Sequence, residues 1–472
     1  MTDALAILEA EIARDLAYID FPPKDWVRPR SHPSGRPVLD VAIEGAGMQG
    51  LAIAFALRRA RIGNILAIDE SPQGREGPWT TYARMPNLRT PKGFVGLDLG
   101  LPSLSVERWY DARFGAGAWD AIQRIPKHHW MEYLNWYRRI LDIPVANDTR
   151  LLQIRPEDGL LRLDLDRGGR QDTVYARKLI RASGIAGAGH PRIPAAISDG
   201  LPRDRYAHTA DAIDFKALAG KRVAVLGAGT SAFDNASTAL EAGAKRVDML
   251  MRRDRLSDVT IVYAMYSFGF LRHYADLDDA RRWAVMQHAS RFTPPPPPET
   301  VQRAERHANF HLRPRTEVMA AHLTDDAVTL DTGQGPLETD FVICGTGFGV
   351  DLQRRPELAD IAGDIALWRD RYTPPAGQRD DALAAHPYLG PHFEYTARDP
   401  ERSPWVGNIH EYSAGSVLSM GPICVGLNGL PFGTARLIEG IARDLFLADA
   451  DAHVAAVRTV TGAPPAGEDW TI

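Results

Sequence analysis

The chain has 472 residues, of which 44% are apolar and 24% are charged, and its net charge is −5. These values are ordinary for a globular protein of two to three domains, and they argue against a nucleic-acid partner because a phosphate backbone requires concentrated Lys and Arg. The two cysteines, Cys344 and Cys424, are too few for a disulfide scaffold and form no CxxC pair, which argues against a dithiol disulfide reductase.

Residues 1–36 are predicted to form an N-terminal arm. Apolar residues recur at helical spacing over 3–18, so we expect a helix that packs on the main body or on a partner subunit. The N-terminus lacks a basic segment followed by an apolar stretch, and no run of about 18 apolar residues occurs. We therefore expect a cytoplasmic protein without a membrane span, and the oligomeric state stays open.

A first βαβ unit follows the arm. A strand over 39–43 runs into a glycine-rich turn and a helix over 51–59, and a second strand over 65–68 ends in Asp69. This order is typical of a parallel sheet.

The turn of this unit carries the pattern Gly45-x-Gly47-x-x-Gly50. The first glycine allows a tight turn, the second lets the backbone approach a pyrophosphate, and the third lets the helix lie close to the sheet. A carboxylate at Asp69 can accept hydrogen bonds from ribose hydroxyls. The alternative, a glycine-rich turn in an unrelated α/β protein, is disfavoured because strand, glycines, helix, strand and acid occur in register.

A second βαβ unit has the same order but a different ending. A strand over 222–226 enters Gly227-x-Gly229, and the next strand, over 246–251, ends in Arg252 and Arg253 rather than in an acid. Guanidinium groups bind a 2′-phosphate, which a carboxylate would repel, so this unit favours NADPH over NADH. The alternative is a pair of solvated surface arginines, and NADH use stays possible. The simplest use of two such sites is hydride transfer from an exchangeable nicotinamide to a tightly held FAD.

The order of motifs over about residues 38–447 resembles that of the class B flavoprotein monooxygenases, which include flavin-containing, Baeyer–Villiger and N-hydroxylating enzymes. The resemblance implies an α/β fold with two nested Rossmann-like dinucleotide-binding domains, in which the NADP-binding domain interrupts the FAD-binding domain. The expected divisions are an N-terminal arm in 1–36, the first segment of the FAD-binding domain in 37–200, an NADP-binding domain in 201–338, and the second segment of the FAD-binding domain, with substrate-facing stretches, in 339–472.

The same resemblance implies the reaction. NADPH would reduce the flavin, O2 would add as a flavin C4a-(hydro)peroxide, and one oxygen atom would pass to a small polar metabolite. The family requires no metal, and the fourteen histidines include no HExxH motif, so none is expected.

Departures from the family pattern bear on the type of oxygenation. The Baeyer–Villiger fingerprint Phe-x-Gly-x-x-x-His-x-x-x-Trp-Pro keeps only His208 and Thr209 here, with Ala212 and Ile213 in place of Trp-Pro. Hydroxylation of nitrogen or another atom is therefore favoured, and Baeyer–Villiger oxygenation is the alternative. A non-oxygenating flavin oxidase or reductase, or a redox-sensing binding protein, would also use two nucleotide folds. In the hinge motif over 340–348, Gly345 replaces the family's Ala.

The resemblance and the motif positions together predict the site residues. The residues expected to bind the cofactors are Gly45, Gly47, Gln49, Gly50, Asp69, Glu70, Trp79, Trp130, Gly184, Gly227, Gly229, Thr230, Ser231, Arg252, Arg253, Gly347, Asn428 and Leu430. Asn87, Arg89 and Lys92 fall where the family passes the reactive edge of the flavin, and with His208 they are the predicted catalytic residues. For these, the alternatives are a loop that touches only adenine or solvent and, for His208, a structural histidine at a hinge. The polar segment 408–416 offers His410, Glu411 and Tyr412 as predicted substrate contacts.

Overall fold

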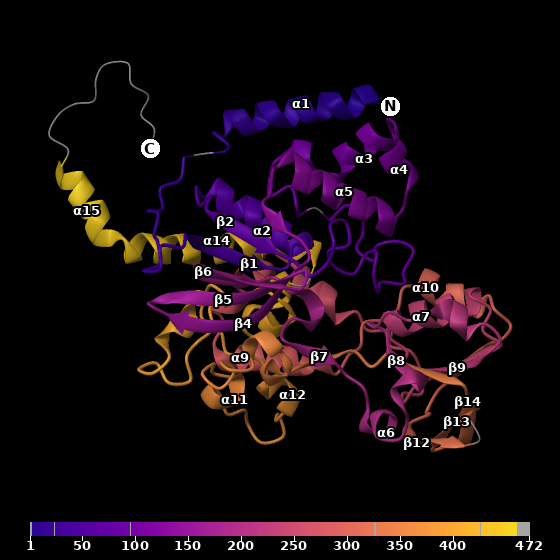
Figure 1. Ribbon diagram of the computed structural model, residues 1–472. Helices are drawn as coiled ribbons and strands as arrows, with labels where there is room; N and C mark the ends of the chain where they lie inside the picture. Colours follow the sequence, from indigo (N-terminus) through magenta and orange to yellow (C-terminus); the bar gives the residue numbers. More distant parts are fainter. Residues whose placement is uncertain (1, 23, 95, 325–326, 425, 460–472) are drawn as a thin grey trace.

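Two sheets, one for each βαβ unit, form the two halves of the molecule (Figure 1). The computed structural model describes residues 2–22, 24–94, 96–324, 327–424 and 426–459. The expected α/β fold with two nested dinucleotide-binding units is confirmed.

The first sheet has seven strands in the order β3-β2-β1-β6-β5-β4, and β17 also pairs with β6. Strands β3, β2, β1, β6 and β17 run parallel, whereas β4, β5 and β6 form an antiparallel meander. The bounds are β1 Val38–Glu44, β2 Ile65–Ile68, β3 Val145–Ala146, β4 Thr149–Glu157, β5 Leu160–Arg167, β6 Arg170–Arg181 and β17 Ile409–Glu411.

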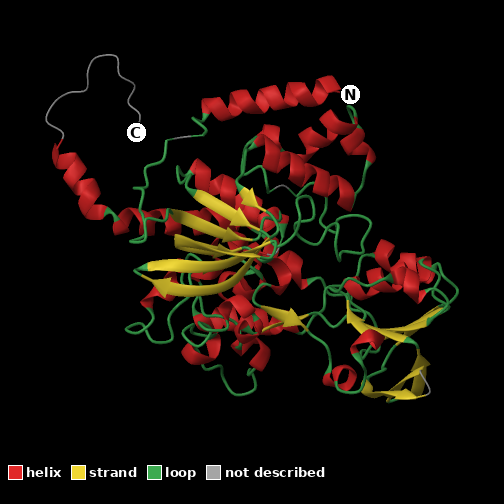
Figure 2. Cartoon of the chain, viewed as in Figure 1, coloured by secondary structure: helices red, strands yellow, loops and turns green. Residues whose placement is uncertain are grey.

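Helices cover this sheet on both sides (Figure 2). The helix of the first βαβ unit, α2 (Met48–Arg59), packs against β1, β2 and the long C-terminal helix α14 (Leu430–Ala448). The other helices of this half are α3 Val106–Phe114, α4 Ala118–Ala121, α5 Lys127–Ile140 and α15 Ala450–Thr459.

The second sheet contains five parallel strands in the order β11-β10-β9-β15-β8. Their bounds are β8 Tyr206–His208, β9 Arg222–Leu226, β10 Arg246–Leu250, β11 Phe310–Arg313 and β15 Phe341–Cys344. Because β15 pairs with β9 and β8, this sheet extends beyond the expected boundary at residue 338, through Cys344. The helices of this unit are α6 Ala195–Ser198, α7 Thr230–Glu241 and α10 Pro298–Glu305, and a small sheet joins β12 Val318–Thr324, β13 Ala327–Thr332 and β14 Gly335–Thr339.

The chain crosses between the two halves twice, and the two crossings lie side by side. Strand β7 (Gly189–Pro191) leaves the first half, and β16 (Phe348–Val350) returns to it, and the two pair antiparallel.

A long insertion after β10 also connects the halves. Its helices α8 (Phe268–His273) and α9 (Asp279–Ser290) lie next to the C-terminal part of the chain (Figure 1). The Trp283 indole donates to the Gln378 carbonyl at 2.9 Å, and Arg282 donates to the Ser419 carbonyl at 3.1 Å. The remaining helices of this region are α11 Trp368–Arg371, α12 Asp381–Ala384 and α13 Val417–Met420.

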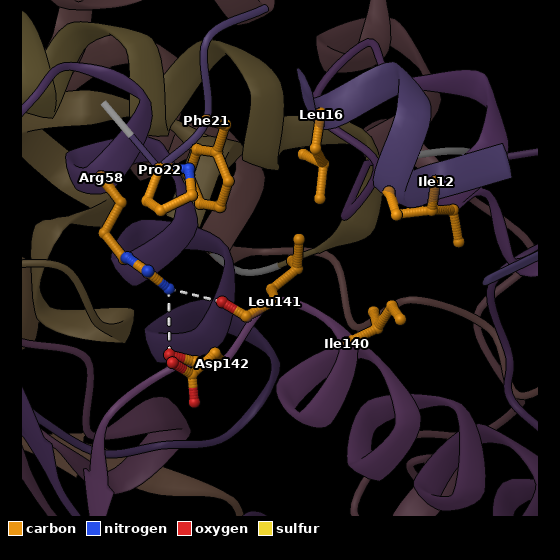
Figure 3. A pocket seen from close by; sticks show the side chains of 9 residues that line it. Ile12, Leu16, Phe21, Pro22, Arg58, Ile140, Leu141 and Asp142 are labelled. Atoms are coloured by element: carbon orange, nitrogen blue, oxygen red, sulfur yellow. Dashed lines mark hydrogen bonds between the residues drawn. The ribbon is translucent and has the colours of Figure 1, made fainter. Parts of the chain in front are cut away.

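The N-terminal arm packs on the main body, which is the first of the two expected placements. The expected helix is α1 (Thr2–Tyr18), and its Leu8, Ile12 and Leu16 side chains are buried in the main core. A cavity of about 290 Å³ lies under its end, lined by apolar side chains and by Arg58 and Asp142 (Figure 3). Arg58 lies about 15 Å along α2 from the glycine-rich turn, so this cavity is not the nucleotide site. Among the described residues, no helix is both long and apolar enough to cross a membrane.

Candidate dinucleotide sites and interdomain face

The first glycine-rich turn is closely packed at two of its three glycines. Gly45 has a φ of +99°, and a Cβ atom there would lie 2.5 Å from the Ala182 carbonyl oxygen. A Cβ atom at Gly50 would overlap the carbonyl of Gly45. These contacts give the tight turn and the close approach of α2 to β1 that the motif predicts.

Gly47 is different, because a Cβ atom there would make an ordinary van der Waals contact and no clash. The atom nearest to a Cβ there would be the Gly77 Cα, at 3.8 Å. Gly47 is also the N-cap of α2, whose first turn receives no side-chain cap and contains no acidic residue. The start of α2 therefore offers unpaired backbone N–H groups and the positive end of the helix dipole. These are the donors that a pyrophosphate requires.

Two tryptophans near this turn have indole N–H groups that donate no hydrogen bond to a described residue. The indole nitrogens of Trp79 and Trp130 are buried without a hydrogen-bond partner among the described residues, and the two rings meet edge to face at 6.1 Å. Trp79 Nε1 would lie 3.6 Å from a Cβ at Gly77. Buried donors normally have acceptors, so these residues fit a ligand with acceptor atoms here, as FAD has.

The acidic residues after β2 have different environments and contacts. Asp69 accepts from the backbone N–H groups of Ala46 (2.9 Å) and Ser71 (2.8 Å), so it fixes the glycine-rich turn and keeps lone pairs for a ribose. Glu70 is exposed. The sequence analysis missed Glu76, which is buried and accepts from Gly74 N–H at 2.8 Å.

Glu76 fixes the turn after β2 that contains Gly74 and Gly77. It also accepts from Asn147 at 2.7 Å and from Arg138 at 3.1 Å. The sequence offered one signal for this role: Glu76 is an acid between two turn glycines, Gly74 and Gly77.

The C-terminal segment closes over the first turn. The Gln49 amide donates to the Cys424 carbonyl, and a Cβ at Gly96 would overlap the Leu427 carbonyl. Asn428 is partly exposed, and its Nδ2 has no partner among the described residues. Leu430 is fully buried at the start of α14, so its role as a cofactor contact stays a prediction.

The glycine-rich turn of the second βαβ unit packs like that of the first, except that an alanine and a glycine have exchanged places. A Cβ at Gly227 would lie 2.6 Å from the Gly345 carbonyl, as Gly45 meets Ala182 in the first unit. The third position of the motif is Ala232 rather than glycine, and a Cβ at Gly345 would lie 2.6 Å from the Ala232 Cβ. Glycine at 345, the departure from the family's Ala, therefore makes room for Ala232.

This exchange predicts a compensating pair. Gly345→Ala is expected to lower the free energy of unfolding by about 1–3 kcal/mol because two methyl groups would overlap. Adding Ala232→Gly should restore some of the loss, although glycine in a helix itself costs about 0.5–1 kcal/mol. Urea unfolding of the two single variants and the double variant measures the coupling, and strictly additive effects would contradict this explanation.

The residues around the turn of the second unit are open to a ligand. Gly229, Thr230 and Ser231 form the start of α7, and a Cβ at Gly229 would meet only the Thr293 methyl, at 4.0 Å. Arg252 and Arg253 are exposed just beyond the carboxyl end of β10. This is where a nucleotide ribose is expected in such a unit.

Of the three predicted flavin-edge residues, Asn87 and Arg89 lie on the face between the two halves, whereas Lys92 contacts the first half. Asn87 is exposed and lines a cavity of about 450 Å³ together with Arg124 and Glu299, which pair at 2.8 Å. Arg89 pairs with the buried Asp234 of α7. Lys92 donates to the Trp119 carbonyl at 2.6 Å. Their catalytic role stays a prediction, and for Arg89 the structure adds a contact between the halves.

The hinges contain the fourth predicted catalytic residue. Gly184 and Gly347 have φ values of +76° and +75° at the two crossings. His208 is fully buried, and its Nε2 lies 3.0 Å from the Gly347 carbonyl. Burial lowers the pKa of His208, so the ring is neutral at physiological pH. This geometry supports the structural alternative, a histidine that fixes the hinge.

A family model described as pyridine nucleotide-disulphide oxidoreductase matches residues 39–362, which span both glycine-rich turns and both hinges. The chain belongs to this family. An FAD-dependent urate hydroxylase from Xanthomonas campestris pv. campestris is 43% identical to this flavoprotein over 455 residues, covering 96% of this chain and 95% of the relative.

Solved structures share the fold at low identity. Ornithine hydroxylase from Pseudomonas aeruginosa aligns with a TM-score of 0.67 and 18% identity over 86% of this chain and 100% of its own. The cadaverine monooxygenase of Erwinia amylovora aligns with a TM-score of 0.65 and 15% identity over 86% and 95%. The expected membership of the class B flavoprotein monooxygenases, and with it an FAD-dependent monooxygenase, is confirmed.

The flavoprotein buries the three residues predicted to contact substrate. His410, Glu411 and Tyr412 are at most 1% exposed, because β17 enters the first sheet beside β6. Burial lowers the pKa of His410 to about 3, so it stays neutral. The Tyr412 hydroxyl has no partner among the described residues and lies against Gly433. As placed, none of the three is reached from solvent, and the structure gives them positions in the core.

Glu411 belongs instead to a buried ionic network that the sequence analysis missed. Arg181, at the end of β6, is fully buried and contacts three glutamates: Glu44 at 2.8 Å, Glu411 at 2.9 Å, and Glu357. Arg181 also donates to the Gly187 carbonyl at 3.0 Å. Burial raises the pKa of Glu44, and the neighbouring guanidinium opposes this rise. Because Glu44 directly precedes Gly45, the network fixes the end of β1 where the glycine-rich turn begins.

Proposed function

We propose that this flavoprotein is an NADPH-dependent hydroxylase that transfers one oxygen atom from O2 to a planar purine, with urate as the first candidate substrate. The observation that carries the proposal is the 43% identity to the urate hydroxylase along nearly the whole of both chains. The broken Baeyer–Villiger fingerprint around His208 supports hydroxylation over ester formation.

The FAD supplies the redox chemistry with NADPH and O2 when it is bound, and this chain supplies binding and orientation. In the proposal, the backbone N–H groups at the start of α2, beside Gly47, bind the pyrophosphate. Asp69 accepts from the ribose, and the Trp79 and Trp130 indoles donate to the cofactor. Gln49 joins this site to the C-terminal segment.

An aromatic rim suits a planar substrate. We use this name for Phe94, Tyr263, Tyr266, Phe268 and Phe432, of which Tyr263 and Phe268 are more than 60% exposed. Phe94 meets Tyr266 at 6.2 Å, and Phe268 meets Phe432 at 5.2 Å, both edge to face. The rim lies near Gly96, which contacts the segment that Gln49 reaches. Exposed aromatic faces can stack on a purine and exclude water from it.

The nucleotide preference is tested through the two arginines after β10. Replacing both Arg252 and Arg253 by Ala is expected to raise the KM for NADPH by about 10–100-fold, because charge-assisted hydrogen bonds to the 2′-phosphate are lost. The KM for NADH should change little. Steady-state kinetics with both nucleotides measure this, with Arg170→Ala, an exposed arginine at the start of β6, as the control. Equal changes with both nucleotides would show that the arginines do not select the phosphate.

A further inference from the structure

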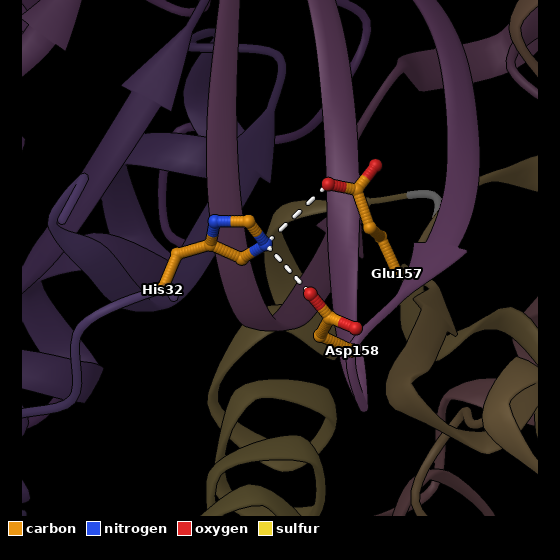
Figure 4. Close-up of side chains that lie close together, drawn as sticks. All are labelled: His32, Glu157 and Asp158. Carbon is orange, nitrogen blue, oxygen red and sulfur yellow. Dashed lines mark ion pairs between the residues drawn. The ribbon is translucent and has the colours of Figure 1, made fainter. Parts of the chain in front are cut away.

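Three side chains that are far apart in the sequence meet outside the nucleotide sites. His32 belongs to the N-terminal arm, whereas Glu157 ends β4 and Asp158 lies in the turn to β5 (Figure 4). Their ligating atoms all lie within 4.8 Å of one another. Spacing in the sequence gives no hint of this cluster, which explains why no metal was expected there.

The distances within the cluster match ligands around a cation. His32 Nε2 lies 3.4 Å from Glu157 Oε1 and 3.3 Å from Asp158 Oδ2. Zinc bonds of about 2.0–2.1 Å in tetrahedral geometry place two ligand atoms about 3.3 Å apart. A direct charge-assisted hydrogen bond would be shorter, at about 2.7–2.9 Å.

The position and contacts of His32 suit a metal ligand. It is only 7% exposed, and its Nε2 points between the two carboxylates without a hydrogen-bond partner among the described residues (Figure 4). The ring stacks on Tyr175 at 3.7 Å and an interplanar angle of 10°. Its Nδ1 lies 2.7 Å from Ser34 Oγ, which can accept the N–H that leaves Nε2 free to bind a metal.

The carboxylate of Glu157 is held in a similar way. The Tyr175 hydroxyl donates to Oε1 at 2.6 Å, and Arg162 donates to Oε2 at 3.1 Å. Such outer contacts are typical of metal ligands.

We propose that His32, Glu157 and Asp158 bind a zinc ion that fastens the N-terminal arm to the β4–β5 turn. The two carboxylates neutralise the ion, and solvent beside the half-exposed Asp158 supplies the fourth ligand. The competing arrangement is an ion pair without metal. The Ser34 backbone N–H, 3.2 Å from Nδ1, favours that arrangement because it requires the proton on Nε2.

The test uses the tag-free, FAD-loaded protein after treatment with a chelator. Titration with Co²⁺ should give visible absorption bands of a four-coordinate ion at one equivalent, and Zn²⁺ should displace them and raise the thermal unfolding midpoint. His32→Ala should abolish both effects. Asp158→Asn alters a largely exposed side chain and should weaken binding by about 10–100-fold without a folding defect, because Asn tolerates the positive φ of +50° there.

A matched control is His322→Ala, which removes an exposed histidine 3.6 Å from Asp331 and should leave metal binding unchanged. Absence of Co²⁺ bands and of a Zn²⁺-dependent shift in the parent protein would overturn the proposal and leave the ion pair. Equal metal binding by the parent and by Asp158→Asn and His32→Ala would overturn it as well. Flavin content and NADPH oxidation report the proposed function separately.

Discussion

Arg181→Met is expected to lower the free energy of unfolding by about 3–5 kcal/mol, because it leaves the buried Glu411 without a cation and leaves Glu44 and Glu357 with Arg355 alone. Arg181 is completely enclosed, and Glu357 and Glu411 are at most 4% exposed. Met has a comparable length, so the loss of charge dominates over the loss of volume. Urea unfolding followed by circular dichroism measures the change.

The deficit should also depend on pH. Burial raises the pKa of Glu44, and the Arg181 guanidinium opposes this rise. Without the guanidinium, the folded-state pKa of Glu44 lies further above its unfolded value, and stability falls as pH rises above the unfolded value. The deficit of Arg181→Met is therefore expected to be larger at pH 8 than at pH 5. The control is Arg402→Met, an exposed partner of Asp364, which should cost at most about 1 kcal/mol. A similar, small effect for both variants would contradict the network's role.

Gly50→Ala and Gly47→Ala are expected to fail for different reasons. The Cβ at position 50 would overlap the Gly45 carbonyl, so α2 must move from the sheet. This variant should lose both stability, by about 1–3 kcal/mol or more, and flavin. The Cβ at position 47 meets no protein atom within 3.8 Å, so that variant should fold normally without cofactor. Its methyl group stands where the pyrophosphate must approach, and FAD affinity should fall at least about tenfold.

Two measurements separate these outcomes. Unfolding of the cofactor-free proteins gives the stability difference, and titration of the same proteins with FAD gives the affinity. Gly363→Ala is the control, because Gly363 is exposed and a Cβ there would meet nothing within 4 Å. If Gly47→Ala bound FAD as tightly as the parent protein, the pyrophosphate would not lie against Gly47.

Local patterns allowed much of this fold to be predicted from the sequence. A strand, a glycine-rich turn and a helix are contiguous in each unit, so their periodicities and turn residues identify them directly. The second sheet's limit at Cys344 was missed because β15 joins through pairing with distant strands. Strand β17 was missed because three residues have too short a pattern to recognise.

The site was harder to predict where contacts are distant in the chain. His410 and Glu411 belong to a polar segment that suggested substrate contact, yet pairing with β6 buries them. A local signal for the ionic network was Arg181, a charge that follows the apolar pair Leu179-Ile180 at the end of β6. The exchange between Ala232 and Gly345 became explicable only when their positions were known.

The central claim is tested most directly by incubating the FAD-loaded protein with NADPH, urate and ¹⁸O₂. We predict that urate accelerates NADPH oxidation and that one labelled oxygen atom appears in the purine product. NADPH oxidation at the same rate with and without urate, with stoichiometric hydrogen peroxide and no labelled product, would contradict the claim and indicate a non-oxygenating flavin oxidase.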